Sequence, residues 1–394
     1  MTELANLRIV NIAHGGWGVA RPEGKVVFVA GAIPGDVVDA EVFQSKKNFA
    51  KADATKLIEA SPSRRAHIWP AADIDKNPKA RPGGADYGHI TPAAQLRYKS
   101  QILAESMKKF AKVTIAEDLV KPIGDHDQGW RTRVDLHVGE NGIPGPFAER
   151  SKNVIGVDSL PLATEAINQA SIHTQDFFGA ERIRIIDNQG EIRLVIDNQK
   201  PSVITETAGG IEFRLADTGF WQVHKNAAET LFTAVNEMID EKLLDPRANN
   251  HDLYGGVGLL ASALLKKDTE AKIISVESDE TAVDFASSNL SFAPHARSVE
   301  SQVDDYLREL SNNSAKLTGA TVIMDPPRVG AGRDVMQNLT SMKPAQIIYV
   351  ACDPVALARD VEFAMQAGYS LQEIKGFDLF PNTHHFEAVA RLTL

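Results

Sequence analysis

The chain has 394 residues, which exceeds the usual size of one hydrophobic core and predicts two or three domains. Hydrophobic residues make up 43% and charged residues 24%, as in ordinary globular proteins, and no run of about 20 apolar residues predicts a membrane span. No secretory signal is visible at the start, so we expect a cytoplasmic protein, and the single cysteine excludes an internal disulfide and any site that needs several thiolates.

The net charge of −10 argues against a nucleic-acid partner, because phosphate binding depends on Lys and Arg. The basic residues, however, are concentrated at the front. Residues 1–133 carry 20 Lys or Arg against 15 Asp or Glu, whereas the remainder carries 22 against 37. This asymmetry is compatible with an N-terminal arm that holds a polyanion, and a merely solvated surface is the alternative.

Residues 1–61 alternate β-branched residues with Gly and Pro, which predicts a small β-barrel. Four lysines flank Phe49 in this segment, and a mixture of cations with an aromatic ring suits a nucleic-acid surface. The alternative is that these lysines are simply solvated charges on the protein surface. The four are Lys46, Lys47, Lys51 and Lys56.

Residues 62–213 predict a central domain of mixed α and β structure. Apolar residues at helical spacing, with Thr91 as the cap and Pro92 in the first turn, predict one long helix over about 92–112. From residue 131 to about 213, strands and turns alternate and predict a mostly antiparallel layer.

Residues 214–394 alternate helices with short apolar strands, which predicts an α/β domain with a doubly wound parallel sheet. Ligands of such sheets bind at the carboxyl ends of the strands, so we expect the catalytic site there.

A glycine turn at residues 252–258 lies between a predicted strand and a helix, and the next strand ends in Glu277. Glycines let backbone amides approach a ligand, and a carboxylate at that strand end suits ribose hydroxyls. A purely structural turn is the alternative. The loop lacks the third glycine of the dinucleotide fingerprint and the lysine of a phosphate-binding loop. S-adenosylmethionine, which has a ribose and no phosphate, therefore fits better than a dinucleotide or ATP.

Three further residues follow or precede apolar strands. Asp325 opens a stiff Asp-Pro-Pro turn, and Cys352 lies just before a predicted helix, where a thiol can have a lowered pKa and act as a nucleophile. Glu387 lies beside aromatic residues, which can raise the pKa of a carboxyl group and make it a base. Taken singly, each residue also has a structural reading: a turn, a buried cysteine and a surface acid.

In combination these segments resemble the uracil-C5 RNA methyltransferases, in the branch that carries an N-terminal TRAM domain. These motifs occur in the family's order, and the resemblance covers nearly the whole chain, most strongly from 219 to 394. The carrying segments are Gly-Phe-Trp-Gln222-Val, Asp252-Leu-Tyr-Gly-Gly-Val-Gly, Val276-Glu277, Asp325-Pro-Pro-Arg, Tyr349-Val-Ala-Cys352-Asp-Pro, Arg359-Asp360 and Phe380-Pro-Asn-Thr-His-His-Phe-Glu387.

The resemblance implies a Rossmann-like methyltransferase domain, with Cys352 as the nucleophile that attacks uracil C6 and Glu387 as the base that removes the C5 proton. It also implies a cofactor site for S-adenosylmethionine. The residues expected to line that site are Gln222, Tyr254, Glu277, Asp304 and Asp325, with Asp304 the weaker candidate near the adenine.

The sequence departs from the family in two places. Many members hold an iron–sulfur cluster, but the matching stretch at 81–90 has no cysteine, so we expect no cluster. The usual Asn after the nucleophile is Asp353, which is expected to alter the charge beside the thiol without changing its chemistry.

We expect a monomer that acts on RNA. The barrel accompanies the ribosomal branch of the family, which favours 23S ribosomal RNA by analogy. Transfer RNA, and a catalytically silent RNA-binding protein with the same fold, are the alternatives.

Overall fold

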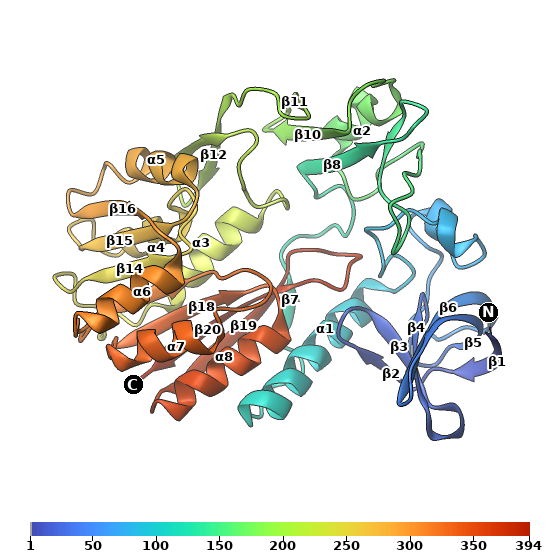
Figure 1. Cartoon of the computed structure of the whole chain (residues 1–394), viewed down its shortest axis with the longest axis horizontal. Helices are drawn as coiled ribbons and strands as arrows, with labels where there is room; N and C mark the ends of the chain where they lie inside the picture. The colour runs from blue at the N-terminus through green and yellow to red at the C-terminus, as the bar shows by residue number, and fades with distance from the viewer. Residues whose placement is uncertain (1) are drawn as a thin grey trace. The chain divides into compact units, whose positions relative to one another are not determined.

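The computed structural model describes residues 2–394, which form two compact units (Figure 1). The N-terminal unit contains the described residues through Ile102, Gly124–Gln199 and Phe380–His385. The sheet unit contains Leu103–Ile123, Lys200–Leu379 and Phe386–Leu394. Within residues 2–394, every helix is too short or too polar to cross a lipid bilayer.

A six-stranded sheet in the order β1-β5-β6-β4-β3-β2 begins the N-terminal unit. Its alternating sequence buries one face: in β4, the side chains of Val27 and Val29 are buried, whereas their neighbours in that strand are half-buried. These valines pack with Val38 and Ala52 in one apolar cluster. The strands are β1 (Thr2–Arg8), β2 (Asn11–Ala13), β3 (Trp17–Ala20), β4 (Val26–Ala30), β5 (Val37–Ser45) and β6 (Phe49–Glu59). The predicted N-terminal β-structure is therefore confirmed.

The segment between β6 and the first helix has little regular structure and is organised around Arg81, whose side chain is buried. Its Nη2 atom donates to the carbonyl oxygens of Ala54 at 2.9 Å and Ile74 at 2.6 Å, and its Nε atom donates to that of Lys76 at 3.0 Å. A buried guanidinium thus joins this segment to strand β6. The segment also contains the short 3₁₀ turns η2 (Pro70–Ala72) and η3 (Pro78–Ala80), and η1 (Pro22–Gly24) lies earlier in the chain.

The predicted long helix is present as α1 (Pro92–Ser106), which continues into a π-helical turn, η4 (Met107–Ala111). The turn ends at Lys112, whose φ of 60° lies in the left-handed region that stops a helix. The chain passes from the N-terminal unit to the sheet unit within α1.

The antiparallel strands expected from 131 to 213 do not form one layer. Four of them make a sheet in the N-terminal unit in the order β11-β10-β8-β9, and the last two make a separate hairpin in the sheet unit. Turn residues 197–202 separate the two groups, a break that the strand pattern alone does not reveal. The elements are β8 (Arg133–Val138), β9 (Pro144–Gly145), α2 (Glu165–Ala170), η5 (Ile172–Thr174), β10 (Arg182–Asn188), β11 (Glu191–Ile196), β12 (Val203–Ala208) and β13 (Ile211–Ala216).

An eight-stranded sheet forms the centre of the sheet unit, in the order β16-β15-β14-β17-β18-β20-β19-β7. The prediction of an all-parallel sheet is wrong in one respect: β20 runs antiparallel to both of its neighbours, β18 and β19. Strand β7 was not predicted to be part of this sheet. It belongs to the predicted central segment but pairs with β19. The strands are β7 (Val120–Pro122), β14 (Asn250–Leu253), β15 (Ile273–Glu277), β16 (Ala296–Glu300), β17 (Thr321–Met324), β18 (Gln346–Ala351), β19 (Ser370–Asp378) and β20 (Glu387–Thr393).

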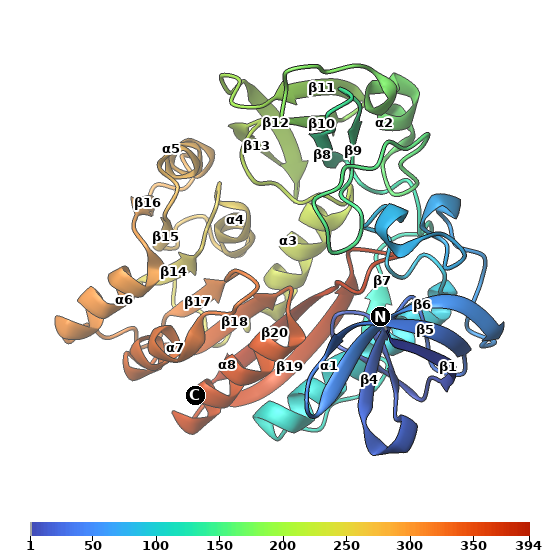
Figure 2. The ribbon, with the colours of Figure 1, turned by 45° about the vertical axis from the view of Figure 1, so that its right-hand side comes forward.

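Helices cover both faces of this sheet, as the near-continuous burial of β14, β17 and β18 requires. Helix α3 packs against α4, and α7 packs against α6 and α8. Figure 2 shows these two groups on opposite faces of the sheet. The helices are α3 (Ala227–Met238), α4 (Leu259–Leu265), α5 (Glu280–Asn289), α6 (Val303–Asn312), α7 (Gly332–Ser341) and α8 (Pro354–Gln366).

Candidate active site

Three of the predicted site residues meet at one edge of the sheet, where β17, β18 and β20 lie side by side. Asp325 follows Met324, the last residue of β17, and Cys352 follows Ala351, the last residue of β18. In the antiparallel pair β18–β20, Ala351 is opposite Ala388. Continuing that register by one residue places Cys352 next to Glu387. The reversal of β20 thus brings the first residue of this strand, rather than its last, to the carboxyl edge of its neighbours.

Each of these three groups has a raised pKa. Burial, with smaller contributions from the charges of Glu387 and Asp325, raises the pKa of Cys352 to about 12. Burial also raises the pKa of Glu387 well above its ordinary value, with an added contribution from the charge of Asp325. Burial alone raises the pKa of Asp325 to about 7. The raised pKa expected for Glu387 is confirmed, but its main cause is burial and not the neighbouring aromatic rings.

The expected lowering of the thiol pKa by the helix that follows Cys352 is wrong. Asp353 caps α8, and its Oδ1 atom accepts the N–H groups of Val355 at 3.0 Å and Ala356 at 2.8 Å. The amides that could stabilise a thiolate are therefore occupied by a carboxylate, whose own charge contributes to the raised pKa of Cys352.

We expect Asp353→Asn to move the onset of Cys352 reactivity to lower pH. The amide oxygen still caps α8, but the negative charge that raises the thiol pKa is lost, so the thiolate forms at lower pH by roughly half a unit to one unit. The measurement is the rate of iodoacetamide alkylation against pH. Asp284→Asn, which removes an exposed charge on α5, is the matched control, and equal profiles for both variants would contradict the expectation.

The carboxyl group of Glu387 is buried, and within residues 2–394 no hydrogen bond satisfies its Oε2 atom. An unpaired buried carboxyl group is costly to a folded protein, so such groups concentrate where they exchange a proton with a bound molecule. Glu387 is therefore suited to proton transfer.

Sequence reasoning assigned no role to Arg328, which follows Asp325-Pro-Pro. Arg328 is exposed, and its charge lowers the pKa of both Cys352 and Glu387 against the larger effect of burial. The Asp-Pro-Pro-Arg sequence is the signal that could have identified it.

Asp360 fixes the loop that follows Arg328. Its Oδ2 atom accepts the hydroxyl of Tyr349 at 2.5 Å and the N–H of Ala331 at 2.7 Å. A Cβ atom on Gly330 would lie 2.7 Å from the same oxygen, so this close approach requires glycine. Asp360, in helix α8, thus holds the turn that carries Arg328.

The glycine turn lies between β14 and α4, at the same edge of the sheet. A Cβ atom on Gly255 would lie 2.0 Å from Ser275 Oγ, so a larger residue would force the Ser275 side chain to move. Glu277, at the end of β15, accepts the N–H of Gly256 at 3.0 Å through Oε2. The structure therefore joins the turn and the predicted ribose-binding carboxylate directly.

Tyr254 begins this turn with a φ of 63°, in the left-handed region. Burial raises its pKa to about 12, and the charges of Asp360 and Asp304 contribute. Tyr254 and Asp304 are thus close enough to interact, as their predicted roles require. Gln222, in contrast, is half-buried in the loop between β13 and α3, and no hydrogen bond among residues 2–394 links it to Tyr254, Glu277 or Asp325.

The charge of this site fits S-adenosylmethionine better than a phosphate-bearing cofactor. Burial, with smaller contributions from the charges of Asp325 and Glu277, raises the pKa of Asp252 to about 8, so several acids share one region. A bound sulfonium cation would favour the ionised forms of these acids and be attracted to them, whereas a phosphate would not, and ribose hydroxyls could donate to Glu277.

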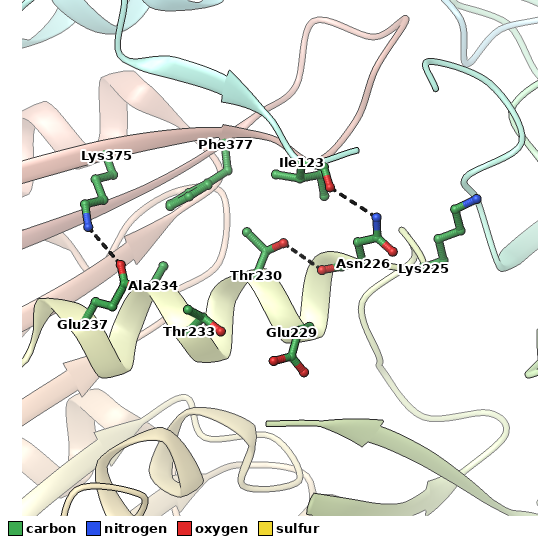
Figure 3. Close-up of a pocket in the computed structure, with 10 residues that line it drawn as sticks. All are labelled: Ile123, Lys225, Asn226, Glu229, Thr230, Thr233, Ala234, Glu237, Lys375 and Phe377. Carbon is green, nitrogen blue, oxygen red and sulfur yellow. Dashed lines mark hydrogen bonds and ion pairs between the residues drawn. The ribbon is translucent and has the colours of Figure 1, made fainter. Parts of the chain in front are cut away.

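A separate cavity of about 480 Å³ lies between α3 and β19 and contains none of the predicted site residues (Figure 3). Its polar groups largely satisfy one another: Lys375 pairs with Glu237 at 3.2 Å, and Asn226 donates to the carbonyl oxygen of Ile123 at 3.2 Å. We assign it no function.

Comparisons with known proteins identify the family of this chain. The family model described as tRNA (uracil-5-)-methyltransferase matches residues 182–393, and that of the TRAM domain matches residues 7–55. An uncharacterized RNA methyltransferase of Streptomyces avermitilis is 32% identical and aligns over 100% of this chain and 98% of its own length. The 23S rRNA (uracil(1939)-C(5))-methyltransferase of Shewanella halifaxensis is 27% identical, over 99% of this chain and 95% of its own.

Among solved structures, the tRNA (uracil-54, C5)-methyltransferase of Pyrococcus abyssi in complex with S-adenosyl-L-homocysteine is similar over 99% of both chains, with a TM-score of 0.73 and 21% identity. At this level of identity the similarity establishes the fold, a Rossmann-like methyltransferase domain together with the N-terminal strands.

Proposed function

The chain belongs to the tRNA (uracil-5-)-methyltransferase family, and from that premise we propose that it methylates C5 of a uridine in 23S ribosomal RNA through a covalent bond to Cys352. Membership makes it an S-adenosylmethionine-dependent RNA methyltransferase with a TRAM domain. The observation that supports the covalent mechanism is the β18–β20 register, which continues to Cys352 opposite Glu387, with the charge of Asp325 acting on both groups.

S-adenosylmethionine supplies an electrophilic methyl group at this site. We assign its ribose to Glu277 and its adenine to the region of Tyr254 and Asp304. Asp325, at the carboxyl end of β17, and Gln222 would complete the site and contact the uracil as well. The shared interaction of Tyr254 with Asp304, and the bond between Glu277 and the glycine turn, support these assignments.

Uracil C5 is a poor nucleophile, so the enzyme must supply electrons to it. The thiol proton of Cys352 passes to ionised Asp325, and Sγ bonds to C6 while the electron pair of the C5–C6 double bond moves to C5 and the adjacent carbonyl group. C5 then takes the methyl group, and the broken S–C bond leaves its electron pair on the thioether S-adenosylhomocysteine. Glu387 removes the C5 proton, the double bond reforms, and Sγ leaves as a thiolate that regains its proton from Asp325.

The pKa values suit this division of roles. A thiol with a pKa of about 12 needs a proton acceptor, and Asp325, with a pKa of about 7, is partly ionised near neutral pH. Glu387 is a stronger base than an ordinary carboxylate once it is ionised, because burial raises its pKa.

The ribosomal assignment is supported by the 23S ribosomal RNA methyltransferase among the relatives, whereas the family name and the Pyrococcus structure favour transfer RNA as the second candidate. We propose that residues 1–61 bind RNA, 62–213 form a central domain and 214–394 catalyse the reaction, in a cytoplasmic monomer. Modification maps of total RNA from a deletion strain and its parent test the proposal. Loss of one 5-methyluridine from 23S ribosomal RNA is expected, and loss from transfer RNA would establish the second candidate.

A different measurement tests the alternative that the chain is a catalytically silent RNA-binding protein. Calorimetry should detect binding of S-adenosylmethionine to the purified chain, because the turn and carboxylates described above are intact. Absence of binding, together with unchanged RNA modification in the deletion strain, would leave RNA binding as the function.

The lysines of the N-terminal sheet are expected to carry the salt dependence of RNA binding. Lys46 and Lys47 are exposed in the turn between β5 and β6, while Lys51 lies over the ring of Trp17 at 4.9 Å. Replacing these three and Lys56 by alanine should reduce the slope of log K against log salt by about 0.7 for each phosphate that the variant no longer neutralises.

The control for this experiment replaces the same number of exposed lysines in the sheet unit, namely Lys242, Lys266, Lys272 and Lys316. It has the same net charge as the test variant. Equal slopes for the two variants in filter binding would show that the N-terminal lysines do not anchor the RNA.

A further inference from the structure

The segment Phe380–His385 connects β19 to Glu387 yet belongs to the N-terminal unit. Glu387 itself has no hydrogen bond at Oε2 within residues 2–394. Its position therefore depends on its backbone and packing. On one side the backbone is held in β20, where Glu387 pairs with Phe377, and on the other side it is entered through this segment.

Asn382 is the fixed point of the segment. It is fully buried and has a φ of 64°, a left-handed conformation that asparagine tolerates better than most residues. Gln95, from α1, binds it twice: Oε1 accepts the backbone N–H of Asn382 at 2.7 Å, and Nε2 donates to Oδ1 at 2.9 Å. The Gln95 side chain is itself buried.

The remaining polar groups of Asn382 are also bonded. The N–H of Tyr87 donates to its carbonyl oxygen at 2.9 Å, and Nδ2 donates to the carbonyl oxygen of Asp127. Arg65 bridges the Oδ1 atom of Asn382 at 2.5 Å and the carboxylate of Asp127 at 2.6 Å. Every hydrogen-bonding group of Asn382 thus has a partner from the N-terminal unit.

A second contact fixes the segment two residues later. Oδ2 of Asp86 accepts both the backbone N–H of His384 at 3.0 Å and its Nδ1–H at 2.6 Å. Burial alone would raise the pKa of Asp86, but the hydrogen bond and charge of His384 hold it below the ordinary value. The segment is therefore restrained at two points within five residues of Glu387.

We propose that Gln95 is a positioning residue for the base Glu387. By binding both the backbone and the side chain of Asn382, Gln95 sets the path of the chain into β20 and thereby the place of the carboxylate beside the C5 proton. This inference depends on the proposed function, because it requires that Glu387 act after the methyl group has moved.

The test is Gln95→Leu in the full-length enzyme, which is similar in size and removes both bonds to Asn382. It also removes the bonds from Nε2 to the carbonyl oxygens of Ile90 at 2.9 Å and Tyr87 at 3.3 Å. Misplacing a catalytic group by about 1 Å can slow its step about a hundredfold. Methyl transfer should continue, but resolution of the covalent adduct should slow by roughly ten- to a hundredfold. A protein–RNA band with label from the cofactor methyl group should accumulate on a denaturing gel, as expected for Glu387→Gln, while S-adenosylmethionine affinity stays at the parental value.

Asn168→Leu is the matched control, because this amide holds another loop of the same unit: it accepts the N–H of Leu160 at 2.9 Å and donates to its carbonyl oxygen at 3.0 Å. If Gln95→Leu does not fold, Asn382→Gly retains the left-handed backbone while removing the side-chain bonds, and the same band is expected.

The outcomes are distinct. A trapped band in the Gln95 or Asn382 variant but not in Asn168→Leu supports the positioning role. Parental adduct resolution in both folded test variants overturns it and leaves the proposed function intact. Absence of uracil-C5 methylation by the parent enzyme overturns the proposed function and this inference together.

Discussion

Replacing Cys352 by alanine is expected to reduce RNA methylation by about four orders of magnitude or more while leaving the affinity for S-adenosylmethionine within about threefold of the parental value. The sulfur forms the bond that activates C5, and Cys352 is the only cysteine in the chain, so no second thiol can replace it. Methylation would be measured by transfer of labelled methyl groups to RNA from the deletion strain, and affinity by calorimetry.

Cys352→Ser is the matched variant for this experiment, since it keeps the size and a polar hydrogen at the end of β18. A hydroxyl ionises far less readily than a thiol, so the serine enzyme should be nearly as inactive as the alanine enzyme. Turnover by either variant near the parental rate would rule out covalent catalysis by this residue.

Much of the catalytic half could be predicted from sequence because its signals are local. Apolar strands followed by Asp325 or Cys352, and a glycine turn followed by a strand that ends in Glu277, place side chains at one sheet edge in any doubly wound fold. The parallel pairing of β17 with β18 confirms that Asp325 and Cys352 follow the carboxyl ends of neighbouring strands.

Other features could not be predicted because they depend on contacts between distant segments. No pattern in residues 387–393 shows that β20 is antiparallel, and this reversal is what brings Glu387 beside Cys352. The hydrogen bonds between Gln95 and Asn382 join residues 287 positions apart. The raised thiol pKa escaped prediction for a different reason. The position of Cys352 before a helix was visible, but the burial of the thiol and the capping of that helix by Asp353 depend on the folded geometry.

The replacement Glu387→Gln is expected to separate methyl transfer from adduct resolution. Gln keeps the size of the carboxyl group and removes its basicity, so Cys352 can still attack and C5 can still take the methyl group, but the C5 proton is not removed. A covalent protein–RNA species should accumulate, and turnover should fall by roughly a hundred- to ten-thousandfold.

The diagnostic observation is a slowly migrating band on a denaturing gel that carries label from the cofactor methyl group. Adding Cys352→Ala to the same chain must abolish the band, because Sγ is the only atom that can form the bond to C6. Parental turnover by Glu387→Gln with no trapped species would remove Glu387 from the mechanism. His384 or His385 would then be the next candidate base.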